Sequence, residues 1–286
     1  MSSVVKVSFY PGCSLESTAR EYSASSRAVC EALEVELREI KDWNCCGATS
    51  VHSLNSALAL ALPARNLALA RDEGRAVVTP CAACYSRLRL AQHTLRRDKE
   101  KRRATEEVLG LPLGRLVEVW SLLELITEQI GLDRVAGRVR QPLGGLKVAC
   151  YYGCLLVRPA KVTGMGRPED PRWLDDLMSC LGAEVRPWSY KTDCCGASHA
   201  ITNPDVARGL VGRLLDMAGE AGAEALVTAC PLCQTNFETQ RPRDNDRPTF
   251  YFTELMGLAF GLPETKNWLS KHLVDPVPLL VKLGLI

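Results

Sequence analysis

A cysteine pattern that occurs twice is the feature that most limits what this chain can fold into. Each copy has a single cysteine, then an adjacent cysteine pair followed by Gly-Ala, then a CxxC pair. The ten members are Cys13, Cys45, Cys46, Cys81 and Cys84 in the first copy and Cys154, Cys194, Cys195, Cys230 and Cys233 in the second. Both copies place 34 residues between the adjacent pair and the CxxC, and 31 or 39 residues before the adjacent pair. Matching spacing over most of the chain indicates an internal duplication.

The duplication predicts two related domains, residues 1–142 and 143–286. The segment 141–145, Gln-Pro-Leu-Gly-Gly, is typical of a linker between them. The longer interval in the second copy fits a loop insertion rich in Pro and Gly at residues 158–171. Because two copies of this length are too few for a solenoid, we expect two domains related by a pseudo-twofold axis.

Strand-like and helix-like segments alternate in both copies. Runs rich in β-branched residues predict strands at 4–9, 76–79, 146–149 and 225–228. Longer helical stretches cover 54–71 and 206–221, and the strand-like segment 116–120 resembles 249–252. This alternation predicts an α/β fold in which each domain is a small, mostly parallel sheet with helices. The pattern cysteines follow strands, at the sheet edge where functional residues gather.

Composition excludes several classes of protein. With 47% hydrophobic and 24% charged residues, the 286-residue chain has enough apolar content for a folded core. A formal net charge of +2 gives no general attraction to nucleic acid, and no apolar run approaches the roughly 18 residues of a membrane span. The N-terminus lacks the features of a signal peptide, so we expect a cytoplasmic protein. In a reducing compartment, cysteines are typically metal-binding or catalytic.

Three interpretations of the five cysteines per copy follow from the residues alone. Disulfides are disfavoured, because adjacent Cα atoms lie about 3.8 Å apart and ordinary disulfides need about 4.4 to 6.8 Å. Structural zinc takes four thiolates and leaves the fifth without a role. An iron-sulfur cluster gives all five a role, and Gly47 or Gly196 lets the backbone turn close to it. The closely spaced cysteine run of ferredoxins is absent, so we expect electrons to arrive from another subunit.

At these cysteines the chain resembles the CCG-domain family, and within it the B subunit of the heterodisulfide reductases. The resemblance covers nearly the whole chain, and no cysteine of the doubled pattern is missing. It implies two noncubane 4Fe-4S clusters, one bound by the five pattern cysteines of each copy. It also implies an enzyme subunit that reduces or forms a disulfide between the clusters. Electrons would come from a ferredoxin-like iron-sulfur subunit, which is often supplied in turn by a flavoprotein subunit.

Side chains outside the pattern are weaker candidates. His199, four residues after Cys195, is a candidate proton donor to a departing thiolate. Arg158 and Lys161, in the insertion, are candidate contacts for an anionic substrate, although a solvated loop is the simpler explanation. The basic run 96–103 is interleaved with Asp and Glu and is interpreted as a solvated helix, not as a nucleic-acid site.

Three cysteines lie outside the five-residue sets. Cys30 and Cys180 are aligned by the repeat at equivalent helical positions and are interpreted as buried packing residues. Cys150 has no assigned role. The resemblance also implies an alternative function, because CCG domains occur as electron-transfer subunits in succinate, glycolate, lactate and sulfur-oxidising complexes. A zinc-stabilised scaffold without redox activity is a further alternative.

Overall fold

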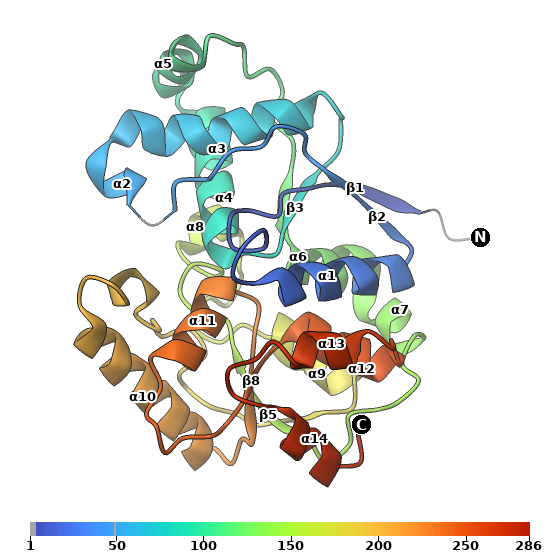
Figure 1. Ribbon diagram of the computed structural model, residues 1–286. Helices are drawn as coiled ribbons and strands as arrows, with labels where there is room; N and C mark the ends of the chain where they lie inside the picture. The colour runs from blue at the N-terminus through green and yellow to red at the C-terminus, as the bar shows by residue number, and fades with distance from the viewer. Residues whose placement is uncertain (1–3, 49) are drawn as a thin grey trace.

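The computed structural model describes residues 4–48 and 50–286. It contains two four-stranded sheets, one in each half of the chain, with the strand orders β2-β1-β3-β4 and β6-β5-β7-β8. All the described strand pairs are parallel. The halves lie one above the other in Figure 1, and their shared topology confirms the predicted α/β fold and its duplication.

The first half carries its helices on both faces of the sheet. Its elements are β1 (Val5–Phe9), α1 (Arg20–Ala32), β2 (Val35–Glu39), α2 (Val51–Leu54), α3 (Ser56–Arg71), β3 (Val77–Thr79), α4 (Ala82–Arg97), α5 (Lys99–Leu109), β4 (Val119–Ser121), α6 (Leu122–Glu124), the π-helix η1 (Leu125–Gly131) and α7 (Leu132–Ala136). Because crossovers between parallel strands are right-handed, α1 covers one face of this sheet, and α3 and α4 cover the other.

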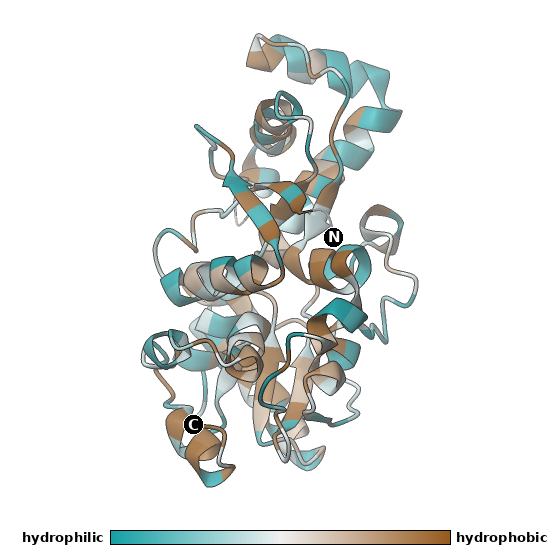
Figure 2. Ribbon diagram, turned by 90° about the vertical axis from the view of Figure 1, so that its right-hand side faces the viewer, coloured by the Kyte–Doolittle hydropathy of each residue, from teal (hydrophilic) through white to brown (hydrophobic). Residues whose placement is uncertain are grey.

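The second half repeats this order with shorter elements around its insertion. Its elements are β5 (Lys147–Tyr151), α8 (Ala160–Thr163), α9 (Trp173–Cys180), β6 (Glu184–Val185), the 3-10 helix η2 (Ala197–His199), α10 (Pro204–Glu220), β7 (Ala225–Thr228), α11 (Pro231–Thr239), β8 (Thr249–Tyr251), α12 (Phe252–Phe260), α13 (Thr265–Leu269) and α14 (Val277–Lys282). The cores of both sheets are apolar, and Figure 2 shows hydrophobic stretches in strands and in several helices.

The strand register shows which residues of the two halves are equivalent. Lys6 lies opposite Glu36 in the first sheet, and Lys147 lies opposite Glu184 in the second. In each half, a helix and a strand precede the adjacent cysteine pair: α1 and β2 in the first half, α9 and β6 in the second. A residue of α1 or β2 therefore corresponds to the residue 148 positions later in α9 or β6. Two strands of this segment, β2 and β6, are not predicted from the sequence because they are short and largely half-buried or exposed.

This offset corrects the expected equivalence of Cys30 and Cys180. Cys30 corresponds to Met178, and both side chains are fully buried in the core. Cys180 is half-buried instead, and its sulfur lies 3.5 Å from the carbonyl oxygen of Leu132. Burial raises the pKa of the Cys30 thiol to about 12, so it is a packing residue. The prediction of buried packing holds for Cys30, whereas Cys180 packs against the core but is only partly buried.

Most of the other predicted elements are found with shifted ends. The strand 225–228 is confirmed as β7, whereas the strand predicted at 116–120 lies too early, because β4 begins at Val119. The helix predicted at 54–71 is two helices, since Asn55 is extended and its side chain accepts a hydrogen bond from the Leu58 amide at 3.0 Å. The insertion 158–171, predicted as a loop, contains the short helix α8.

The halves pack along a seam with pseudo-twofold symmetry. Helix α1 of the first half packs on α12 and α13, and α9 of the second half packs on α6 and α7. Tyr22 stacks on Tyr251 across the seam, with ring centroids 4.0 Å apart and planes 4° from parallel. Beside them, the hydroxyls of Ser25 and Thr253 share a buried hydrogen bond of 2.7 Å. Stacking adds about 0.5–1.5 kcal/mol to the burial of such rings, so these contacts hold the halves together.

Membrane-spanning helices were not expected from the sequence. Within residues 4–48 and 50–286, the structure contains no helix that is both long and apolar enough to cross a bilayer.

Candidate metal centres

The pattern cysteines of each half gather at the carboxyl edge of its sheet. In the first half, Cys13 follows β1, the adjacent pair follows β2, and Cys81 precedes α4, which contains Cys84. Strands β1 and β3 are neighbours whose onward connections run in opposite directions. In open parallel sheets, ligands bind at such a switch point. The second half repeats this placement around β5 and β7.

Each cysteine set has a buried part and a solvent-facing part. In the first half the Sγ atoms of Cys46 and Cys84 lie 3.4 Å apart in the interior, and Cys81 is buried beside them. Cys13 and Cys45 are exposed, and the Cys45 sulfur accepts a hydrogen bond from the Gly47 amide at 3.4 Å. The set therefore extends from the core to the surface.

The second half has the same arrangement. The Sγ atoms of Cys195 and Cys233 lie 3.5 Å apart, and Cys230 is buried. Cys154 is half-buried, and Cys194 is exposed and accepts from the Gly196 amide at 3.3 Å. All these cysteines are free in the structure, so the interpretation as disulfides has no support here.

A buried tyrosine lies among the sulfur atoms of each set. The Tyr10 hydroxyl donates to the carbonyl oxygen of Asn44 at 2.8 Å, and the Tyr151 hydroxyl donates to that of Asp193 at 2.6 Å. Burial, followed by the charges of four cysteines of the same set, raises the pKa of each phenol. Each tyrosine thus stays neutral and fixes the residue that precedes the adjacent cysteine pair. The spacing before the first cysteine makes Tyr151 the equivalent of Tyr10.

A glycine before the first cysteine leaves space for a sulfur atom. Gly12 has φ +73°, and a Cβ at this position would lie 2.8 Å from the Cys84 Sγ. Its equivalent Gly153 has φ +68°, and a Cβ there would lie 3.2 Å from the Cys233 Sγ. Only glycine meets both the left-handed backbone and this close approach. The glycines that follow the adjacent cysteine pairs are also left-handed, as expected from the sequence.

We expect Gly12→Ala to reduce metal loading of the first half. The new Cβ would displace Cys84 and would also strain the backbone by about 1–2 kcal/mol. The matched control is Gly110→Ala, because Gly110 has φ +66° but no atom within 4 Å of an added Cβ. Iron per chain after anaerobic reconstitution should fall for Gly12→Ala and stay at the wild-type value for Gly110→Ala. An equal effect of both variants would mean that backbone strain alone explains the loss.

In each set some thiols favour the thiolate form, whereas hydrogen bonds to neighbouring sulfurs and burial raise the pKa of others, such as Cys84 and Cys233. Hydrogen bonds from the Cys45 thiol and then from Cys84 lower the pKa of Cys46 to about 4. A hydrogen bond from the Cys154 thiol is the main cause that lowers the pKa of Cys194 to about 6, and the charge of His199 adds to it. The thiolate is the form of cysteine that binds metals. Cys46 in the first set and Cys194 in the second are therefore thiols that readily take the metal-binding form.

The two cysteine sets meet at the seam. Cys81 and Cys230, the first cysteines of the two CxxC pairs, lie close enough to each other across the seam for each to affect the pKa of the other. The adjacent Tyr22 hydroxyl donates to the carbonyl oxygen of Pro80 at 3.2 Å. The two sets therefore approach each other at the seam.

The chemistry of the donors fits iron-sulfur clusters. Five thiols per set exceed the four ligands of a structural zinc ion, whereas iron-sulfur clusters are bound by cysteine thiolates. In the described part of the chain, no three His, Cys, Asp or Glu side chains are arranged around a position for a single metal ion. The number and type of donors, rather than a ready-made coordination shell, therefore favour clusters over zinc.

The structure places the other candidate residues, His199, Arg158 and Lys161, in different surroundings. His199 is exposed near Cys194, where its charge acts on the thiol. Arg158 forms an ion pair with Glu169 and hydrogen-bonds to Thr192, two residues before Cys194. Lys161 faces a different cleft, between α4 and α8. Arg158 and Lys161 therefore do not form one substrate-binding pair.

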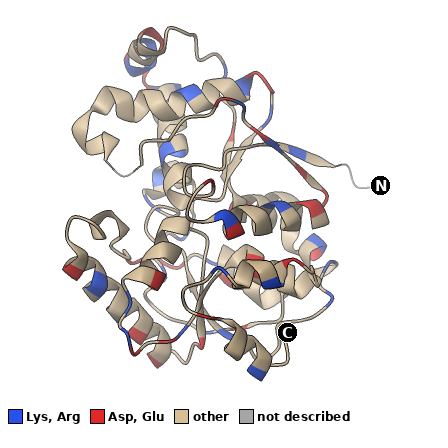
Figure 3. Ribbon diagram, in the orientation of Figure 1, with Lys and Arg blue, Asp and Glu red and all other residues tan. Residues whose placement is uncertain are grey.

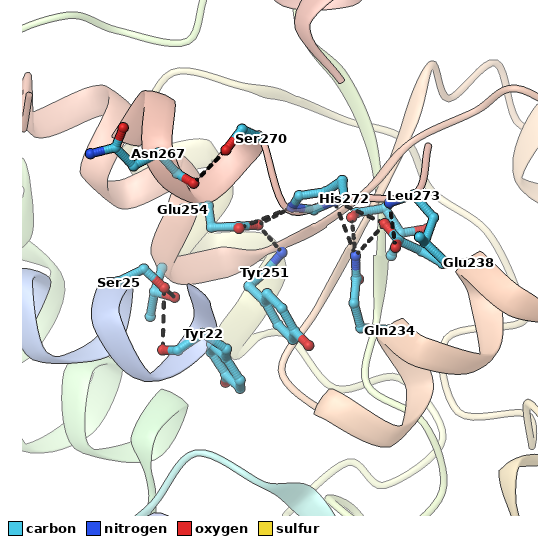
Figure 4. A network of polar contacts seen from close by, with 12 residues as sticks. Tyr22, Ser25, Gln234, Glu238, Tyr251, Glu254, Asn267, Ser270, His272 and Leu273 are labelled. Atoms are coloured by element: carbon cyan, nitrogen blue, oxygen red, sulfur yellow. Dashed lines mark hydrogen bonds and ion pairs between the residues drawn. The ribbon is translucent and has the colours of Figure 1, made fainter. Parts of the chain in front are cut away.

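A buried charged network lies behind the second set, and sequence analysis did not identify it. His272 lies between Glu238 and Glu254, with one ring nitrogen 2.9 Å from a carboxylate oxygen of each (Figure 4). Burial lowers the pKa of an imidazole, but Glu254 and then Glu238 outweigh it and raise the pKa of His272 to about 10. Gln234, next to Cys233, approaches the same ring at 3.3 Å. The network ties the C-terminal segment to the helix of the second CxxC.

Comparisons with known proteins identify the same two cysteine-rich regions. The model of the CCG family, a cysteine-rich domain, matches residues 7–89 and 148–238. The membrane anchor subunit of the 8-methylmenaquinol:fumarate reductase of Wolinella succinogenes is 30% identical, over 95% of this chain and 98% of that protein. The B subunit of a ferredoxin/F(420)H(2)-dependent CoB-CoM heterodisulfide reductase of Methanosarcina acetivorans is 28% identical, over 98% of this chain and 97% of that protein.

A solved structure shares the fold. A hypothetical protein from Helicobacter pylori superposes with a TM-score of 0.76 at 14% identity, over 96% of this chain and 53% of that chain. The family match contains all ten pattern cysteines, and the relatives are subunits of reductases. The chain therefore belongs to the CCG cysteine-rich domain family and is homologous to the B subunit of heterodisulfide reductases.

Proposed function

We propose that this chain is an iron-sulfur redox subunit of a multisubunit reductase, and that it cleaves or forms a disulfide between two noncubane 4Fe-4S clusters. Each half, 1–142 and 143–286, would hold one cluster through its five pattern cysteines. Homology to reductase subunits supports the redox role. The placement of the two cysteine sets supports the disulfide chemistry.

The observation that carries the proposal is that Cys81 and Cys230 lie close enough across the seam to affect each other's pKa, so the two cysteine sets approach each other there. Cleavage of one S–S bond consumes two electrons and two protons and gives two thiols. When bound, two clusters supply one electron each. Because the buried ends of both donor sets approach each other at one seam, two clusters bound there would lie side by side, and each could serve one sulfur atom of a single substrate.

Individual side chains have distinct roles in this proposal. The exposed Cys45 and Cys194 mark where substrate approaches the sets from solvent. Tyr10 and Tyr151 are fully buried and exclude water from the inner sulfurs. His199, beside Cys194, is the proposed proton donor to a departing thiolate.

Electrons enter from other subunits in this proposal. A ferredoxin-like iron-sulfur subunit is the proposed direct partner, with a flavoprotein subunit behind it. Arg158, hydrogen-bonded to Thr192, is close enough to Cys154 for their charges to interact, which suits contact with an anionic substrate group at the second set.

Metal analysis of anaerobically purified protein tests the proposal. We expect about eight iron and matching acid-labile sulfide per chain. We also expect an EPR signal of the oxidised protein that changes when a candidate thiol is added. One or two zinc per chain with no labile sulfide would support the scaffold alternative and contradict the proposal.

A second function has support from one finding. The relative from Wolinella succinogenes, 30% identical, belongs to a fumarate reductase. In that case the chain passes electrons to or from a partner that performs the chemistry. About eight iron per chain with an EPR signal that no thiol changes would favour this electron-transfer role over disulfide cleavage.

A further inference from the structure

A basic cleft lies between the two halves, and none of its lining residues is a pattern cysteine. It encloses about 210 Å³ between α4 and the α8 insertion, and we call it the α4–α8 cleft. Its lining residues are Arg89, Gln92, His93, Arg96, Arg97, Lys161, Val162 and Gly164. Lys161 comes from the second half and the cationic side chains of α4 come from the first. The cleft therefore exists only when both halves are in place.

The spacing of the α4 residues explains the gathering of charge. Positions 89, 93, 96 and 97 follow one another at helical intervals and project from one face. Figure 3 shows basic residues gathered along α4. The basic run 96–103 is thus not a single solvated helix, because it is divided at Asp98, which caps α5. Arg96 and Arg97 belong to the cleft, whereas Arg103 pairs with Glu107 on α5.

The positive charge of the cleft is only partly neutralised. Glu118 lies 2.8 Å from Arg96 and 3.9 Å from Arg89. Within the described residues, no carboxylate lies within 4.0 Å of Arg97 or Lys161. Burial, followed by the charges of Arg97, Lys161 and Arg89, lowers the pKa of His93. The cleft thus combines uncompensated cations with a predominantly neutral imidazole at neutral pH.

One wall of the cleft is held by hydrogen bonds. The Tyr85 hydroxyl and the Arg89 guanidinium both donate to the carbonyl oxygen of Thr163, each at 3.2 Å. Arg89 also bonds to Gln92 at 3.3 Å, while its Nε is buried and has no hydrogen-bond partner. Arg89 is therefore fixed in place rather than free in solvent. A fixed guanidinium binds an oxyanion with a smaller loss of side-chain entropy.

We propose that the α4–α8 cleft binds a small oxyanion, a phosphate or carboxylate group, between the exposed Arg97 and Lys161 and beside the fixed Arg89. Guanidinium and ammonium groups form strong charge-assisted hydrogen bonds with both kinds of group. The volume admits an anion of a few heavy atoms. Bound there, the anion links α4 to the insertion and so joins the two halves. The proposal does not depend on the chemistry of the cysteine sets.

Calorimetric titration of the full anaerobic protein tests the site. Inorganic phosphate and succinate are the two probes, each titrated at constant ionic strength against a chloride blank. We expect saturable binding of one anion per chain. Lys161→Gln and Arg97→Gln should each weaken binding about 10-fold. The control Arg103→Gln removes a neighbouring arginine outside the cleft and should leave binding unchanged.

The two probes distinguish the sources of the oxyanion. Saturation by phosphate alone identifies a phosphate site, and saturation by succinate alone identifies a carboxylate site. Failure of both probes to saturate would overturn the proposal. Equal binding by wild type, Lys161→Gln and Arg97→Gln would overturn it as well, because the anion would then lie elsewhere. Iron content, measured on the same samples, shows whether each variant is folded and loaded.

Discussion

Serine in place of Cys45 or Cys194 is expected to abolish turnover while leaving part of the iron-sulfur chromophore. Both residues are exposed at the solvent-facing end of their sets, while the inner sulfurs of each set stay buried. Loss of one ligand of five leaves four thiolates, so some iron should remain bound. We expect activity below about 1% of wild type in either variant, because each half serves one of the two sulfur atoms.

The control for this pair is Cys180→Ser. Cys180 is half-buried and lies outside both sets, and its sulfur approaches the Leu132 carbonyl oxygen. Iron content, visible absorption and disulfide reduction should be measured together under anaerobic conditions. Unchanged activity in Cys45→Ser or Cys194→Ser would exclude a mechanism that needs both sets.

Replacement of His272 by glutamine should cause the largest loss of stability outside the cysteine sets. The change removes the cation between two carboxylates, and Glu254 is fully buried. Breaking a buried ion pair from one side costs about 3–5 kcal/mol. For a chain of this size, the midpoint of thermal unfolding should fall by about 6 °C or more. The exposed His52 gives the matched control, and His52→Gln should leave the midpoint unchanged.

The effect of His272 should also depend on pH. Its folded pKa is raised to about 10, above the value of about 6.5 in an unfolded chain. Such a group stabilises the folded state fully below about pH 6.5, and this contribution is lost as the pH rises through about 10. The groups that face it are Glu238, Glu254 and, from α1, Glu21. A difference between wild type and His272→Gln that stays constant from about pH 6 to 10.5 would contradict a charged imidazole.

The sequence predicted the duplication and the candidate ligands because sulfur chemistry depends on a few residues at fixed intervals. The ten cysteines follow strands or open helices, and parallel strands bring such positions to one edge of a sheet. The predicted equivalence of Cys30 and Cys180 is wrong because it was based on residue type alone. That alignment matched the cysteines by residue type and ignored the strand register. The register pairs Glu36 with Lys6 of β1 and Glu184 with Lys147 of β5, so Glu36 and Glu184 are the equivalent residues.

Contacts between the halves were beyond sequence analysis. Tyr22 and Tyr251 are 229 residues apart, and nothing in their local sequence predicts that they stack. The α4–α8 cleft needs Lys161 from the insertion beside arginines that are locally typical of a solvated helix. The position of Tyr10, two residues before a glycine-cysteine pair, was a usable signal, since its equivalent Tyr151 has the same spacing.

The proximity of Cys81 to Cys230 across the seam has an evolutionary consequence. A residue that meets its own counterpart on a twofold axis is what a dimer of two identical subunits produces, because such an interface uses the same patch on both sides. The two-domain chain has the geometry of such a dimer after gene duplication and fusion. Once fused, the copies were free to diverge away from the axis, and the 158–171 insertion arose in one of them only. At the axis itself, a change in either copy alters both sites at once.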